Sequence, residues 1–132
     1  MSNAKVITYH HVTNLDHPVI SLKKHPKMSE SLRRACRDLG LEPYACTHAV
    51  VAYCNGKAVG TFRYALTGNS LEAKGTAVIP SMRRKGIAYK LWELALTKIY
   101  PTEVVVATES DEGESLVVKL SKDYTICVWH IY

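Results

Sequence analysis

Three consecutive cations stand just before a glycine in the second half of the chain, in the order Arg83, Arg84, Lys85 and Gly86. A helix is predicted to begin here, because apolar residues recur with helical period from Ile87 onward. The free N–H groups and the macrodipole already make the beginning of a helix positive. Each cation placed there costs a few tenths to about 1 kcal/mol unless an anion is bound nearby. The spacing therefore favours a phosphate site.

Small residues in the same segment support this interpretation. Gly86 has no Cβ and Ala88 has only a methyl group, so a phosphate can approach the backbone N–H groups closely. The alternative is a surface turn whose cations extend into solvent and whose glycine provides flexibility. The sequence contains neither GxGxxG nor GxxxxGK[ST], so Rossmann and P-loop sites lack their residues.

The hydrophobic pattern shows which elements must position this segment. Runs of β-branched and aromatic residues predict strands, and apolar residues three and four apart predict helices. Strands are expected over residues 5–13, 50–54, 57–66, 71–79, 103–108 and 124–132, and helices over 29–39, 87–99 and 111–120. Asn55-Gly56 tolerates positive φ and predicts a hairpin turn, while Pro80 ends the third strand of an antiparallel meander. The run 103–108 is nearly all apolar, which is typical of a strand in a parallel pair.

The predicted order of elements is β-α-β-β-β-α-β-α-β. We therefore expect an α/β (α+β) fold with a mixed, mostly antiparallel sheet flanked by helices. A chain of 132 residues in which 47% are hydrophobic is long enough for one domain over residues 1–132 and too short for two. Residues 1–4 are assigned no function.

Composition limits the classes of protein that need to be considered. The formal charge of +5 is compatible with an anionic ligand, but it is also an ordinary feature of soluble small domains. The four cysteines and six histidines show no spacing typical of a metal site, so we predict reduced, buried thiols and no metal. No apolar stretch is long enough to span a membrane and no secretion signal is present, so we expect a cytoplasmic protein.

Residues 78–88, VIPSMRRKGIA, resemble the cofactor signature of the GNAT acyltransferase superfamily. In that signature a strand ending in V-x-P is followed by [R/Q]-x-x-G-x-[G/A], which opens a helix. Arg83, Gly86 and Ala88 occupy its three defining positions, and Val78 and Pro80 occupy the flanking ones. The predicted meander before the segment, and the helix, strand, helix and strand after it, follow the order of this family.

The resemblance implies a site for acetyl-CoA as co-substrate. Its pyrophosphate would be bound by backbone N–H groups of Arg84, Lys85, Gly86, Ile87 and Ala88. Its pantetheine arm would pair with the main chain of Val78 and Ile79, where the fourth strand splays from the fifth in a parallel pair. A neutral amine would then attack the bound thioester directly, without a metal.

The resemblance also implies two catalytic groups. Glu72 lies eight residues before Pro80, where many relatives carry a glutamate that acts as general base. The alternative is that Glu72 is a solvated charge on a strand. Many relatives also place a tyrosine acid in the helix after the fifth strand, but Lys119 stands at that position here. Tyr124 could approach the thiol only if this helix ends early, and solvent is the alternative acid.

The acceptor and the partners follow less directly. We expect an N-acetyltransferase for a primary amine of a small molecule or a protein. The alternatives are a toxin-like enzyme acting on aminoacyl-tRNA and a catalytically weak acyl-CoA-binding or interaction module. Arg33, Arg34 and Arg37 on the first helix would suit a nucleic acid, but interleaved aromatic residues are absent. Relatives usually have two strands after the last helix, whereas only one is expected here. Either the sheet is truncated or a partner chain covers its exposed edge, and we expect a homodimer.

Overall fold

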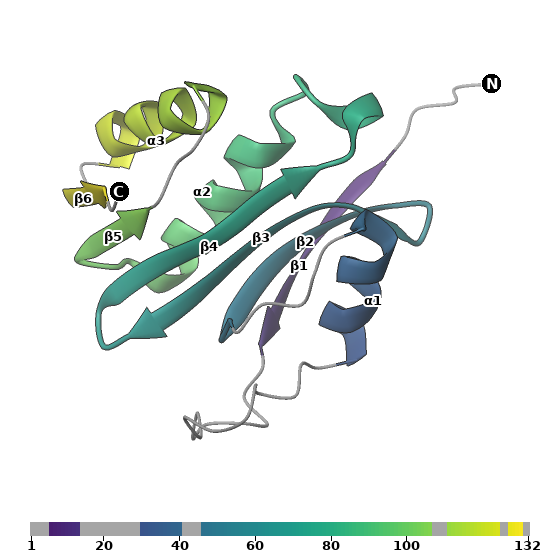
Figure 1. The fold of residues 1–132 in the computed structure, drawn as a ribbon, viewed down its shortest axis with the longest axis horizontal. Helices are drawn as coiled ribbons and strands as arrows, with labels where there is room; N and C mark the ends of the chain where they lie inside the picture. The colour runs from purple at the N-terminus through teal and green to yellow at the C-terminus, as the bar shows by residue number, and fades with distance from the viewer. Residues whose placement is uncertain (1–5, 14–29, 41–45, 107–110, 125–126, 131–132) are drawn as a thin grey trace.

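Six strands form one mixed sheet in the order β1-β2-β3-β4-β5-β6 (Figure 1). The computed structural model describes residues 6–13, 30–40, 46–106, 111–124 and 127–130. The strands are β1 (Ile7–Thr13), β2 (His48–Cys54), β3 (Lys57–Thr67), β4 (Ser70–Val78), β5 (Glu103–Val106) and β6 (Cys127–His130). The helices are α1 (Glu30–Leu39), the 3₁₀ turn η1 (Pro80–Met82), α2 (Ile87–Ile99) and α3 (Asp111–Tyr124). This order of strands and α-helices confirms the sequence prediction.

Strands β2 to β4 pair antiparallel and β4 pairs with β5 in parallel, as predicted, and β1 adds to β2 in antiparallel direction. The turn between β2 and β3 has positive φ at both Asn55 and Gly56, which is the hairpin geometry expected for these residues. A second parallel pair, between β5 and β6, was not predicted. The crossover helix α3 joins these two strands, so their parallel direction follows from the connection.

The two faces of the sheet bury different helices. On β2, Val50 and Ala52 contact the cluster that contains α2 and α3, whereas Ala49 and Val51 contact the cluster that contains α1. Side chains alternate across a strand, so an uninterrupted apolar run such as this one requires cover on both faces. Figure 1 accordingly shows α1 on one side of the sheet and α2 on the other. None of the helices in the described part of the chain is long and apolar enough to cross a membrane.

Gly60 allows α2 to lie close to β3. A Cβ built at Gly60 would be 3.2 Å from Ile87 Cγ2, 3.3 Å from the Ala77 carbonyl oxygen and 3.4 Å from Leu91 Cδ1. Contacts this close leave no space for a branched side chain. The glycine therefore sets the distance between the sheet and the first turn of α2.

Replacing this glycine should destabilise the fold. We expect Gly60→Val to lower the free energy of unfolding by about 2 kcal/mol, since overpacked cores typically lose about 1 to 3 kcal/mol. Urea unfolding followed by circular dichroism measures the change. In a Gly60→Val/Ile87→Ala double variant the Ile87 Cγ2 contact is gone, and part of the loss should be recovered. Strictly additive losses would show that this contact is not the cause.

Candidate functional site

Strand β4 separates from β5 after a short parallel segment. Pairing to β5 covers only three residues of β4, in the pairs Ser70 with Glu103, Leu71 with Val104 and Glu72 with Val105. The pairing of β4 with β3 then shifts register, because Arg63 faces Gly75 whereas Tyr64 faces Ala73. Lys74 is therefore an extra residue on β4, and such a bulge bends a strand.

The bulge also brings a buried arginine against the backbone of β4. Arg63 is 3% exposed, and a Cβ at Gly75 would lie only 2.8 Å from its Nη2 atom. A side chain at this point would therefore push the end of the Arg63 side chain aside. The splay predicted for the fourth and fifth strands begins immediately before this bulge.

Main-chain groups at the end of β4 face the open side of the splay. The Ile79 N–H donates to the Val59 carbonyl on β3, and the Ile79 carbonyl accepts from the Met82 N–H. Because main-chain groups alternate in direction along a strand, the N–H and C=O of Val78 point away from β3. Of the two residues predicted to pair with a pantetheine arm, Ile79 has both main-chain groups engaged, whereas Val78 offers its N–H, and its carbonyl already accepts from Arg83 Nε.

The loop between η1 and α2 contains the three cations. Arg83 has extended backbone geometry, and its Nε donates to the Val78 carbonyl at 3.0 Å. Arg84 has φ 62° and Gly86 has φ 77°, so two residues in the loop are left-handed. A left-handed arginine is unfavourable by about 1 kcal/mol, whereas Gly86 adopts this conformation freely. Helix α2 itself begins at Ile87, so the cations precede the helix instead of forming its first turn.

The beginning of α2 has free donors. Gly86 is the N-cap residue and supplies no side-chain cap, and its carbonyl accepts from the Lys90 N–H. The N–H groups of Ile87, Ala88 and Tyr89 have no acceptor within the described residues. The first turn of α2 also contains no acidic residue. Three aligned donors with two arginines beside them form a site suited to a phosphate group.

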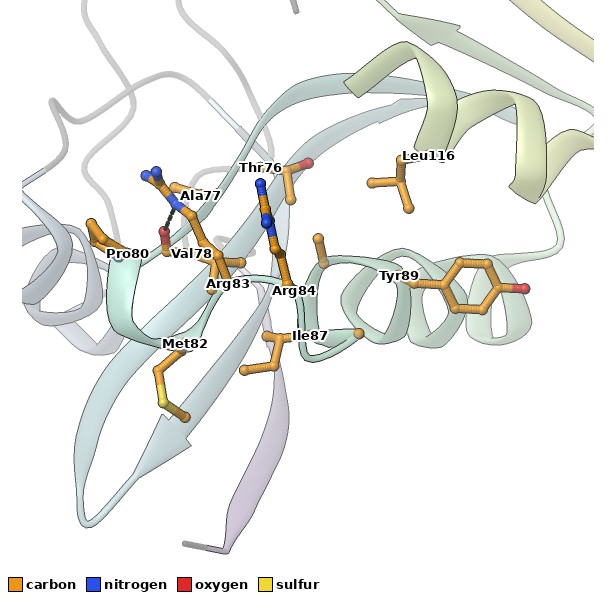
Figure 2. Close-up of a pocket in the computed structure, with 12 residues that line it drawn as sticks. Thr76, Ala77, Val78, Pro80, Met82, Arg83, Arg84, Ile87, Tyr89 and Leu116 are labelled. Atoms are coloured by element: carbon orange, nitrogen blue, oxygen red, sulfur yellow. Dashed lines mark hydrogen bonds between the residues drawn. The ribbon is translucent and has the colours of Figure 1, made fainter. Parts of the chain in front are cut away.

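These elements enclose a pocket of about 810 Å³ (Figure 2). The described residues that line it are Thr76, Ala77, Val78, Pro80, Met82, Arg83, Arg84, Gly86, Ile87, Ala88, Tyr89 and Leu116. Of the predicted cofactor-binding residues, Ile79 and Lys85 are not part of this lining. In Figure 2, Arg84 points across the pocket, whereas Leu116 approaches it from α3.

Sequence analysis missed some of the lining. Thr76, Ala77 and Met82 lie on or near the signature but carried no signal of their own, and Tyr89 lies one residue beyond it. Leu116 was predicted only as part of the helix over residues 111–120. The pattern of α3 shows which of its residues are buried, but not that one of them faces this pocket.

Glu72 lies on the opposite face of the sheet from α2. Its neighbours Leu71 and Ala73 pack into the core beneath α2 and α3, so the side chain between them points the other way. The Glu72 carboxylate accepts a hydrogen bond from Lys74 Nζ at 3.1 Å, and the glutamate side chain is 47% exposed. Glu72 is the last β4 residue paired with β5, so it marks the vertex of the splay.

Tyr124 bridges two helices. Helix α3 continues through Tyr124, so this residue does not begin the last strand, and the early helix end that would bring it to a thiol does not occur. Its hydroxyl donates to Glu93 Oε2 on α2 at 2.6 Å. This hydrogen bond is the main cause that raises the pKa of Tyr124 to about 12. At the position predicted for the acid, Lys119 lies with its Nζ 4.7 Å from the centre of the Tyr89 ring.

The hydrogen bond between Tyr124 and Glu93 predicts a pH effect. The hydrogen bonds from Tyr124 and Lys90 lower the pKa of Glu93, so their stabilisation is present above the ordinary pKa of a glutamate and is lost as pH falls through the lowered one. We expect Tyr124→Phe to raise the pKa of Glu93 toward its ordinary value, measured by NMR titration of the carboxyl carbon, with kcat changed less than about twofold. A large fall in kcat at an unchanged Glu93 pKa would make Tyr124 a catalytic acid.

The structure also places the cysteines and the arginines of α1 that the sequence analysis considered. Cys36, Cys46 and Cys54 are buried, and burial raises the pKa of the Cys46 thiol to about 11. Arg34 and Arg37 are exposed on α1, as expected for a solvated face. Within the ranges that the structure describes, no group of three His, Cys, Asp or Glu side chains is placed to hold a metal ion.

Comparison with known proteins now adds to this geometry. Residues 12–112 match the sequence profile described as the acetyltransferase (GNAT) family. A search of curated proteins finds no match. The fold resembles a GNAT-family acetyltransferase from Streptococcus pneumoniae, with a TM-score of 0.62 and 18% identity over 96% of this chain and 97% of that one.

Two further solved structures contain coenzyme A. An N-acetyl transferase from Escherichia coli, solved bound to coenzyme A, has a TM-score of 0.56 and 15% identity over 90% of this chain and 89% of that one. Diaminobutyrate acetyltransferase from Paenibacillus lautus was solved in complex with its substrate L-2,4-diaminobutyric acid and coenzyme A. It has a TM-score of 0.58 and 14% identity over 91% of this chain and 77% of that one. At these identities the similarity establishes the fold.

Proposed function

This chain belongs to the acetyltransferase (GNAT) family, and we propose that it transfers the acetyl group of acetyl-CoA directly to a primary amine of a small molecule or a protein. One observation carries the proposal. The open main-chain edge of β4 and the uncapped beginning of α2 line a single pocket. A ligand with an extended amide arm and a diphosphate at its end matches this combination.

The residues present fit such a ligand. The N–H groups of Ile87, Ala88 and Tyr89, together with the Arg84 guanidinium, would hold the diphosphate. The Val78 N–H would donate to a carbonyl oxygen of the arm, while the Val78 carbonyl already accepts from Arg83 Nε. Acetyl-CoA supplies a thioester, whose carbonyl carbon is the electrophile. The pocket then contributes mainly by positioning the two substrates.

Proton removal is assigned to Glu72. The attacking amine must be neutral and must lose a proton as its nitrogen forms the amide bond. The position of this carboxylate at the vertex of the splay, partly open to solvent, supports a role in accepting that proton directly or through one water. Tyr124 is left with a structural role, so we propose that solvent protonates the departing thiolate.

The test is direct detection of acetyl transfer. The purified protein is incubated with acetyl-CoA and a panel of diamines, amino acids and peptides, and thiol release and product mass are measured together. We expect amine-dependent release of CoA with an N-acetylated product. Binding of acetyl-CoA without any product across the panel would instead support a binding or interaction module. Release of CoA at the same rate with no amine present would reduce the activity to hydrolysis.

Assembly and location extend the proposal. Strand β6 is the last strand of the sheet, so it presents an edge to a second copy, and we propose a homodimer through it. Light scattering that finds only monomers at working concentration would contradict this. The buried free thiols of Cys36 and Cys54 support a reducing compartment, and we propose the cytoplasm.

A further inference from the structure

A tryptophan on α2 is hydrogen bonded to a threonine that lines the pocket. Trp92 Nε1 donates to Thr76 Oγ1 at 2.8 Å. The indole is 4% exposed and stacks on Phe62, with ring centres 4.1 Å apart. It is therefore held on two sides, by the stacking and by its hydrogen bond. Thr76 itself is exposed, because its hydroxyl faces the pocket.

This hydrogen bond determines what the threonine can offer a ligand. An indole N–H can only donate, so the Thr76 oxygen must act as acceptor toward Trp92. The hydroxyl proton is then left for another acceptor, and no acceptor for it occurs among the described residues. In Figure 2 the Thr76 oxygen points into the space between Arg84 and Leu116. The pocket thus contains an oriented neutral donor in addition to its cations.

We infer that the Thr76 hydroxyl donates a hydrogen bond to a carbonyl oxygen of the pantetheine arm, with Trp92 as the residue that positions it. This inference rests on the proposed function, since it names a contact to acetyl-CoA. Thr76 is two residues before Val78 on the open edge of β4, whereas the backbone N–H groups that would bind the diphosphate begin at Ile87. A carbonyl on the arm is therefore the nearer acceptor in the ligand.

The first part of the test compares two ligands and four proteins by calorimetry. The ligands are CoA and adenosine 3′-phosphate 5′-diphosphate, which has the phosphates of CoA but no pantetheine. The proteins are the parent, Thr76→Val, Thr76→Ser and the control Thr97→Val. Like Thr76, Thr97 has a hydroxyl that is hydrogen bonded to a residue of α2, since it donates to the Glu93 carbonyl. Thr97 lies outside the pocket lining. Thermal unfolding of each variant shows whether it is folded.

We expect Thr76→Val to weaken CoA binding about five- to tenfold, because one hydrogen bond is lost. Binding of the nucleotide without pantetheine should be unchanged. Thr76→Ser retains the hydroxyl and should bind CoA within about twofold of the parent, as should Thr97→Val. In a Trp92→Phe background, which keeps the stacking but removes the N–H, Thr76→Val should cost less than in the parent.

The contrary outcomes are separable. A parent that binds CoA and a Thr76→Val variant that binds it equally well would overturn the inference alone. Equal losses for both ligands would assign the hydroxyl to the phosphates and also overturn it. A folded parent that binds neither ligand would overturn the proposed function itself. If Thr76→Val is unfolded, the Trp92→Phe variant still decides, because an unaltered CoA affinity in that variant removes the positioning role.

Discussion

Acetyl-CoA binding is expected to weaken more than about 100-fold when Arg84 and Gly86 are both replaced by glutamate. The parent provides three free N–H groups at the beginning of α2, with Arg84 across the pocket. The double variant removes a cation and places two carboxylates where a diphosphate would bind. It also forces a side chain onto the left-handed backbone of Gly86, which is unfavourable by about 1 kcal/mol. Calorimetric titration of acetyl-CoA measures the loss.

A control must separate local from overall charge. The double variant changes the net charge by −3, and a Lys57→Glu/Lys122→Gln variant changes it by the same amount. Lys57 begins β3 and Lys122 lies in the last turn of α3, and neither residue lines the pocket. We expect this control to bind acetyl-CoA within about threefold of the parent at physiological salt. An equal loss in both proteins would show that long-range charge is the cause.

The second large effect concerns the chemical step. We expect Glu72→Gln to lower kcat about 100-fold, the usual contribution of a general base, while KM for acetyl-CoA changes little. Glutamine has the shape of glutamate but cannot accept the amine proton. It can still contact Lys74, so the packing at the vertex should be kept. Steady-state kinetics with the best amine from the panel measure both constants.

Glu103→Gln is the matched control for this result. Glu103 lies on the adjacent strand β5 and pairs with Ser70, two residues before Glu72. The same chemical change there should leave kcat within about twofold, since a carboxylate without a role in proton transfer contributes no barrier lowering. Full activity in Glu72→Gln would return Glu72 to the alternative interpretation, a solvated charge paired with Lys74.

Much of the fold was predictable because its signals are local. Asn55-Gly56 specifies a turn through the φ values that these two residues tolerate, and the apolar spacing after Ile87 specifies a helix. The signature over residues 78–88 is also local, because a strand end, a glycine and a helix start must follow one another directly to form the phosphate site. These features depend on neighbours a few residues apart, which the sequence displays.

The boundaries were less predictable where a distant contact sets them. Helix α3 extends to Tyr124, whose hydroxyl bonds to Glu93, a residue 31 positions earlier. Judged from the sequence alone, Tyr124 was predicted as the first residue of the last strand. The three cations were predicted at the beginning of α2, but the left-handed Gly86 separates them from the first turn of the helix.

The sequence by itself therefore determined the order of the elements, the antiparallel meander and the position of the phosphate segment. Only the tertiary structure decided which main-chain and side-chain groups face the pocket. The extra residue Lys74 sets where β4 leaves β5, the pairing of Ile79 with Val59 turns Val78 toward the opening, and Trp92 orients Thr76. The physical reason is that direction along a strand alternates with every residue, so one bulge or one distant hydrogen bond reverses what a local pattern predicts.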